Sequence, residues 1–285
     1  MAPRPARTLV LVLVVATLAG CGPSRSTGGE EMALTVTRDY GRTDFVALRH
    51  ERVPPPGGLA RIFQRYANTR DAESLFVNGI LAVEPAAQLE VHGGDRVWLD
   101  QHDAGVAARI PAVVGAFPEP FLHGSEGKRL PVRVECDNPR AGACAAVAGK
   151  LVKLGVVAGR SIISRSAADE TVRILVGPWN RLRGRDLESD SIDAGPRSSG
   201  VYARFDVTGR RLAVLNPAGR VARTLGAGAG LIAATREKDR QPVWFVTGTD
   251  DAGVASAARA LDESVLADHF ALAIADDLPV AVPQP

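Results

Sequence analysis

The sequence predicts an α+β protein in which a small strand-rich domain precedes a mixed α/β sandwich domain. Apolar residues alternate with a period of two near the start, whereas strand-like and helix-like patterns alternate in the second half. With 285 residues, 46% of them hydrophobic, the chain is long enough to bury a core without a structural metal. We divide it into a signal peptide (1–20), a flexible tether (21–31), the strand-rich domain (32–103), a proline-containing connector (104–128), the α/β domain (129–279) and a tail (280–285).

The first 21 residues carry an export signal. Residues 1–7 include two arginines and no acid, and residues 8–18 form an apolar run too short to span a bilayer stably. The run ends in LAGC (18–21), which resembles the lipobox of bacterial lipoproteins. We therefore expect Cys21 to become the first residue, to carry a diacylglycerol and palmitate-type acyl chains, and to anchor the protein at the extracytoplasmic face of the cell membrane. The alternative is an ordinary signal peptide in which Cys21 has no role.

The net charge of the chain limits the classes of partner that we expect it to bind. Removal of Arg4 and Arg7 with the signal peptide takes the formal charge from +2 to 0. A neutral chain without a cluster of lysines and arginines is not expected to bind nucleic acid, and membrane attachment then depends on the N-terminal lipid.

The two remaining cysteines, Cys136 and Cys144, are eight positions apart. In an exported chain we expect them to form a disulfide, worth on the order of 2–3 kcal/mol for so small a ring. No further nitrogen or sulfur ligands follow at the spacing of a zinc finger.

The strand-rich domain begins with a predicted hairpin formed by residues 34–37 and 43–49. Leu59, Ile62, Phe63 and Tyr66 then follow helical spacing. Further extended segments are predicted at 74–77, 81–83, 89–91 and 96–100, with Asn78-Gly79 as a tight turn. A hairpin, one helix and returning strands are the order of a β-grasp fold.

Three of these segments resemble one family. The opening strand (34–40), the turn Phe-Val-Asn-Gly (76–79) and the strand Gly-Asp-Arg-Val-Trp (94–98) are together similar to the transcobalamin-like C-terminal domain, a β-grasp-like module also found in exported bacterial proteins. The resemblance covers about residues 33–103. It implies binding of a flat organic ligand, with cobalamin the first to try, although the family's aromatic run before the turn is replaced here by 72–75 and no helical partner domain is predicted.

The candidate ligand-binding residues come from this domain and the connector. They are Asn78 and Gly79 at the turn, Trp98 on the last strand, and Phe117, Glu119 and Phe121 in the segment FPEPF. The prolines make that segment stiff and extended. Two alternatives stay open: the connector buries its two rings along a domain surface, and Trp98 belongs to the core.

The second domain alternates strands and helices, which predicts a layered sheet, and a hairpin makes that sheet mixed. The expected strands are 131–135, 171–176, 200–207, 211–215, 243–246 and 270–275, and the expected helices are 144–154 and 253–266.

Four motifs invite a chemical interpretation, and each has a structural one that we prefer. Residues 247–251 are expected to cap a helix, and the glycine-rich segment 226–230 is expected to be a flexible loop because its spacing is not that of a dinucleotide site. Ser125 and Lys128 match a nucleophile–lysine spacing, but Pro131 argues against the helix it requires. The possible metal ligands His92, Asp95, Asp100, His102 and Asp103 are expected on a solvated edge, and no cofactor is identified.

These observations favour a non-catalytic, lipid-anchored binding or accessory protein of the bacterial cell envelope. Its expected partner is a small organic molecule or another envelope protein. The rival is a cell-envelope hydrolase in which carboxylates such as Glu119 and Asp250 converge in the fold.

Overall fold

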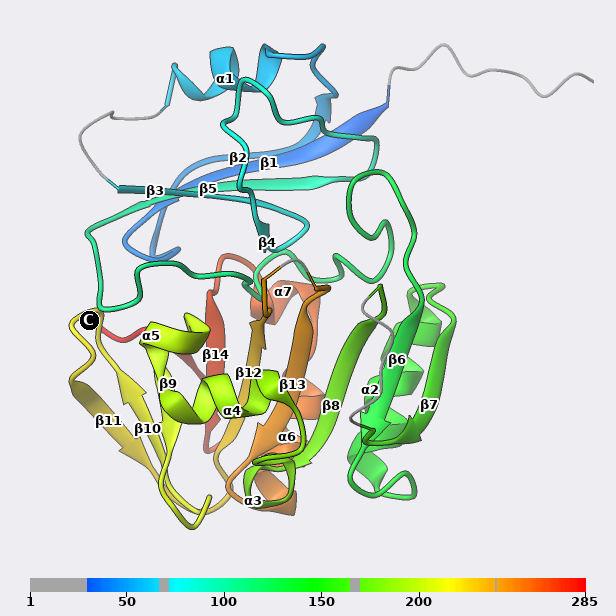
Figure 1. The fold of residues 1–285 in the computed structure, drawn as a ribbon, viewed down its shortest axis with the longest axis vertical. Helices are drawn as coiled ribbons and strands as arrows, with labels where there is room; N and C mark the ends of the chain where they lie inside the picture. The colour runs from blue at the N-terminus through cyan, green and yellow to red at the C-terminus, as the bar shows by residue number, and fades with distance from the viewer. Residues whose placement is uncertain (1–29, 67–71, 165–169, 239) are drawn as a thin grey trace, which may run out of the picture.

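A computed structural model describes residues 30–66, 72–164, 170–238 and 240–285 (Figure 1). The segment predicted to be a signal peptide and Cys21, the predicted lipidation site, lie outside these residues. Within them the protein is a mixed α and β structure dominated by strands, which form sheets of five, three and seven strands.

The five-stranded sheet contains the N-terminal segments. Its order is β2-β1-β5-β3-β4, and the central pair β1 and β5 is parallel while the other pairs are antiparallel. Asn78 and Gly79, both with positive φ, form the predicted turn between β3 and β4. The elements are β1 (Glu31–Arg38), β2 (Thr43–Arg52), α1 (Gly58–Phe63), β3 (Ala72–Val77), β4 (Ile80–Leu81) and β5 (Arg96–His102).

Side-chain alternation gives this sheet two different faces. One face carries the apolar side chains of Leu34, Val36, Val97 and Leu99. They form a core with Leu59 and Phe63 of α1. Helix α1 covers this face in Figure 1, and the opposite face looks toward the rest of the molecule.

The seven-stranded sheet is mixed, with the order β15-β14-β12-β13-β8-β6-β7. Strands β13, β8, β6 and β7 are parallel, and the other pairs are antiparallel. The strands are β6 (Val132–Cys136), β7 (Ala158–Ile162), β8 (Val172–Pro178), β12 (Gly230–Thr235), β13 (Val243–Gly248), β14 (Ala271–Ala275) and β15 (Leu278–Val282).

Both faces of this sheet are covered. Helices α2 and α6 pack together on one face over Val134, Ile174 and Val246. Short helices and the three-stranded sheet, of order β11-β10-β9, cover the other face. These elements are α2 (Gly142–Lys153), α3 (Trp179–Leu182), α4 (Leu187–Ala194), α5 (Pro196–Ser199), α6 (Asp251–Ala260), α7 (Glu263–Leu266), β9 (Ala203–Phe205), β10 (Leu212–Leu215) and β11 (Val221–Leu225).

The two larger sheets share one hydrophobic core. Trp98 and Phe76 of the five-stranded sheet each contact the ring of Phe270, at centroid distances of 5.1 and 5.6 Å. Tyr40 contacts Tyr202 and Phe270 in the same way. The five-stranded sheet therefore closes the end of the larger sheet at which the parallel strands begin (Figure 1).

Several predicted boundaries need correction. The predicted tail is wrong because Leu278–Val282 forms the edge strand β15, and the tether prediction extends too far because β1 begins at Glu31. The helix expected at 253–266 divides into α6 and α7, since Asp262 caps a new helix. The segment 89–91 is not a strand, and β7, β11, β12 and α3 to α5 were not predicted.

Candidate functional site

A cleft of about 710 Å³ lies between the five-stranded sheet and the second half of the chain. One wall comes from β1, β2 and β5, and the other from the end of α2, the segment before α7, and α7 itself. Part of the connector, Gly115 to Phe117, closes its inner end.

Small side chains create this cleft. On the inner face of the sheet, β1 and β2 present Ala33, Thr35 and Ala47, whereas β5 presents Trp98. Trp98 fills the space between the sheets, but side chains as short as alanine and threonine leave a gap. The β1–β2 half of the face is thus open, and Ala47 is exposed there.

Charged side chains surround the opening. Lys150 Nζ donates hydrogen bonds to the carbonyl oxygens of Arg259 and Leu261, so it joins α2 to the end of α6. Lys153, one turn further, is exposed and pairs with no acid among the described residues. It is the cation most available to an anionic group in the cleft.

An ion pair crosses the inner part of the cleft. Arg96 on β5 pairs with Glu263 of α7 at 2.7 Å and donates a second hydrogen bond to the carbonyl oxygen of Phe117 at 3.1 Å. Both partners are only partly exposed. Arg96 therefore fixes the connector and α7 against the sheet and sets the width of the cleft.

Trp98 is mainly a core residue. Its side chain is 3% exposed, it packs on Phe76 and Phe270, and its Nε1 donates to Thr37 Oγ1 at 2.8 Å. Only its edge lines the cleft, with Phe117 next to it. The interpretation of Trp98 as an exposed contact residue is therefore wrong, and the core alternative is confirmed.

The acid and histidine residues near Trp98 form a buried network. Asp100 accepts hydrogen bonds from Thr37 Oγ1 and from the backbone N–H groups of Tyr40 and Gly41, and His102 Nδ1 lies 2.6 Å from its Oδ1. Asp95, Asp100 and His102 are all buried, so the prediction of a solvated edge is wrong for them. In the part of the chain that the structure describes, no three such side chains are grouped to hold a metal ion.

The turn residues Asn78 and Gly79 are structural. Asn78 Nδ2 donates to Asp95 at 2.7 Å and to the carbonyl oxygen of Gly124 at 3.0 Å, and its Oδ1 accepts from the N–H group of Arg96. A Cβ atom at Gly79 would lie 2.7 Å from the carbonyl oxygen of Val113. Neither residue lines the cleft.

The connector buries its two rings, as one of the alternatives predicted, but residues 117–121 form successive turns, so the prediction of an extended segment is wrong. Phe117 and Phe121 pack against Trp244 at centroid distances of 6.0 and 5.0 Å. Between them, Glu119 is 1% exposed, accepts a hydrogen bond from the N–H group of His123 at 2.9 Å, and also contacts His123 Nδ1. Burial raises the pKa of the Glu119 carboxyl group above its ordinary value of 4.5, although His123 opposes the shift.

The carboxylates of the rival hydrolase hypothesis do not meet. Glu119 lies between the two rings that pack on Trp244, the second residue of β13, whereas Asp250 comes two residues after Gly248, the last residue of that strand. Within the strand, the four steps from Trp244 to Gly248 alone span about 13 Å. Asp250 instead caps α6, accepting from Gly253 N–H at 2.8 Å, as predicted, and it also accepts from Gly228 N–H.

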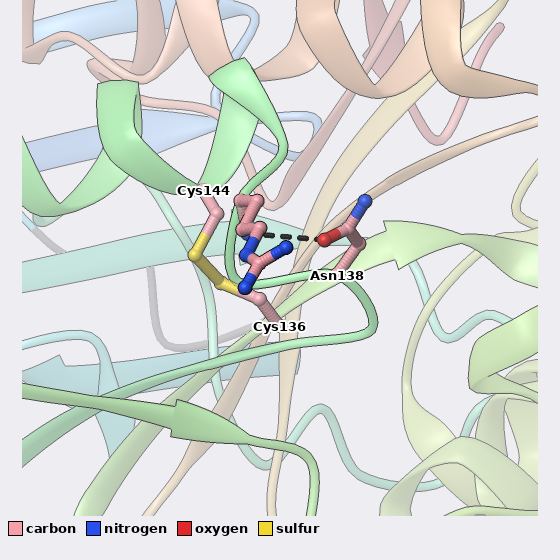
Figure 2. The surroundings of a disulfide bond; sticks show 4 residues. Cys136, Asn138 and Cys144 are labelled. Carbon is pink, nitrogen blue, oxygen red and sulfur yellow. Dashed lines mark hydrogen bonds between the residues drawn. A yellow bond between two sulfur atoms is a disulfide. The ribbon is translucent and has the colours of Figure 1, made fainter.

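The predicted disulfide between Cys136 and Cys144 is present (Figure 2). It joins the end of β6 to the first turn of α2, with the two Cα atoms 6.0 Å apart. Next to it, Asn138 Oδ1 accepts a hydrogen bond from the N–H group of Arg140 at 3.0 Å, which shapes the loop between these elements. Ser125 and Lys128 pair in a short hairpin rather than a helix, which agrees with the structural interpretation of that motif.

Sequence reasoning missed most of the cleft. Ala33, Thr35 and Ala47 carry no signal of binding in a sequence, and Lys153 is an ordinary cation in the last turn of a helix. The only available hint was that small residues alternate with Leu34 and Val36 along β1.

Comparison with known protein families, with curated proteins and with solved structures finds no match to this chain. Among the described residues no helix has the length and apolar character needed to cross a membrane.

Proposed function

We propose that this chain is a lipid-anchored, non-catalytic binding protein of the bacterial cell envelope, whose ligand is a small, flat organic molecule held in the cleft. The cleft itself carries the proposal. Its volume of about 710 Å³ falls within the range of roughly 300–1,000 Å³ of small-molecule sites, and such sites combine an apolar lining with few polar groups.

The shape of the lining supports a flat ligand. Ala33, Thr35 and Ala47 form a low surface against which a planar molecule can lie, and Trp98 and Phe117 also line the cleft. Lys153 at the opening favours a ligand that carries an anionic substituent.

The order of the five-stranded sheet supports a β-grasp-like module. A hairpin is followed by one helix, and β5 returns to lie parallel to β1 in the centre of the sheet. The transcobalamin-like family identity is part of the proposal. Cobalamin is larger than the ligands that usually fill a cleft of this volume, so we favour a smaller flat molecule.

The envelope location rests on the sequence LAGC (18–21) and on the disulfide. Disulfides persist in oxidising compartments outside the cytoplasm, so the pair Cys136 and Cys144 supports export.

A thermal-shift screen of the full chain tests the proposal. The compounds are hydroxocobalamin, riboflavin, haem and a set of aromatic carboxylates, and a ligand of the cleft raises the Tm. Ala47→Trp should remove this shift because its indole fills the exposed floor of the cleft. The matched control is Ala222→Trp, at an exposed alanine of the edge strand β11, which should keep the shift. A shift that is equal in both variants would place the ligand elsewhere and contradict the proposal.

A further inference from the structure

The turn between α2 and β7 exposes aliphatic side chains to solvent. Val157 is 93% exposed, Val152 65% and Leu154 36%. Lys153 and Arg160 are exposed beside them, and neither pairs with an acid in the described part of the chain. We call these five residues the α2–β7 patch. A soluble protein usually scatters exposed apolar side chains singly, so this grouping indicates an interaction surface.

The α2–β7 patch lies at the opening of the cleft. Lys153 and Leu154 line the cleft and are exposed, which places them at its rim. On the other wall His50 is also exposed and contacts Glu31, the first residue of β1, at 3.0 Å. The described chain therefore begins at the same opening that the patch borders.

The length of the preceding tether limits how far this opening can be from the membrane. Nine residues, 21–29, separate the proposed lipid on Cys21 from the first described residue. Fully extended, nine residues reach about 30 Å. A lipid on Cys21 thus holds the β1 end of the cleft within that distance of the bilayer.

We propose that the α2–β7 patch docks on the bilayer that carries the lipid anchor. The aliphatic side chains enter the boundary between headgroups and acyl chains, and Lys153 and Arg160 contact anionic headgroups. This inference rests on the proposed anchor. It also refines the expectation from net charge: the whole mature chain is neutral, but the patch gathers two cations and no acid.

Docking orients the binding site. Because the patch and the start of the described chain border the same opening, a docked protein presents its cleft toward the membrane surface. A ligand then enters from the membrane side.

Site-specific labelling of the lipidated full chain tests this orientation. Val157→Cys is labelled with a nitrobenzoxadiazole fluorophore, and the protein is reconstituted into phosphatidylcholine–phosphatidylglycerol vesicles that contain a nitroxide-labelled lipid. The matched control is Val207→Cys: Val207 is 91% exposed and lies in the turn after β9, beside α3 at the opposite end of the parallel strands. Both native cysteines of the described chain are paired, so each variant has one free thiol there.

We expect the label at Val157→Cys to be quenched at least about threefold more than the label at Val207→Cys. Equal quenching in a protein that floats with the vesicles would overturn docking but leave the anchor intact. A protein that does not float would overturn the anchor and the docking together. Quenching that is unchanged in pure phosphatidylcholine vesicles would overturn the role given to Lys153 and Arg160.

Discussion

The two halves of the inner face of the five-stranded sheet differ: one is packed against the rest of the protein, and the other lines the cleft. On the β3–β5 half, Phe76 and Trp98 meet Phe270 and are buried. On the β1–β2 half, the side chains of Ala33 and Ala47 are too short to fill the space that Trp98 fills on the other half, and they line the cleft. Both halves belong to one sheet and face the second half of the chain. The size of the side chains, rather than the backbone, therefore decides where the protein closes and where it stays open.

The polar groups differ between the halves in the same way. In the closed half, Asp100 makes hydrogen bonds to Thr37, Tyr40 and Gly41, so each buried group has a partner. Across the cleft from the open half, Lys153 at the end of α2 is exposed and pairs with no acid among the described residues. The closed half joins the two sheets, and the open half is where we propose that a ligand binds.

The largest expected effect is in the closed half. Trp98→Ala should lower the free energy of unfolding by about 3–5 kcal/mol, because it leaves a cavity between the two sheets and removes the partner of Thr37. Chemical denaturation followed by circular dichroism measures this. A loss below about 1 kcal/mol would show that Trp98 is not the contact that joins the sheets.

A smaller loss is expected from the buried network. Asp100→Asn should cost about 1–3 kcal/mol, because an amide group cannot accept all the hydrogen bonds that the carboxylate accepts. Thr35→Val, on the open half of the same strand as Thr37, is the control and should change stability by less than about 0.5 kcal/mol. If the two variants lose the same stability, the halves are not distinguished by their polar groups.

Glu119, in the connector that closes the inner end of the cleft, should make stability depend on pH. Burial raises its pKa above 4.5, so the folded chain holds this proton more tightly than the unfolded chain. The stabilising contribution is present at low pH and is lost as pH rises from about 4.5 through the folded-state pKa. Between about pH 4 and pH 7, the free energy of unfolding should fall less in Glu119→Gln than in the parent protein. A larger fall in Glu119→Gln would contradict the raised pKa.

The smallest effect on stability is expected in the open half. Ala47→Trp should change the free energy of unfolding by less than about 0.5 kcal/mol, since its side chain enters an open cleft rather than a packed core. Thermal denaturation of this variant beside Ala222→Trp provides the measurement. A marked destabilisation of Ala47→Trp alone would mean that the cleft is closed in solution.

Local patterns were enough to predict the hairpin of β1 and β2, the turn at Asn78-Gly79 and the disulfide, because neighbouring residues determine each of them. Strand β12 was missed because three of its six residues, Gly230, Ala233 and Ala234, are of types that are depleted in strands. The burial of Trp98 could not be predicted from local patterns, for another reason. It depends on Phe270, which is far away in the sequence and comes immediately before β14 of the seven-stranded sheet.

The central claim, that the open half is a binding site for a flat organic molecule, is tested most directly by titration with 8-anilinonaphthalene-1-sulfonate, a flat aromatic anion. Fluorescence enhancement should saturate at one molecule per chain in the parent protein and in Ala222→Trp, and it should weaken at least about tenfold in Ala47→Trp, whose indole occupies the cleft. Saturation with the same stoichiometry and affinity in Ala47→Trp would show that the cleft does not bind such molecules.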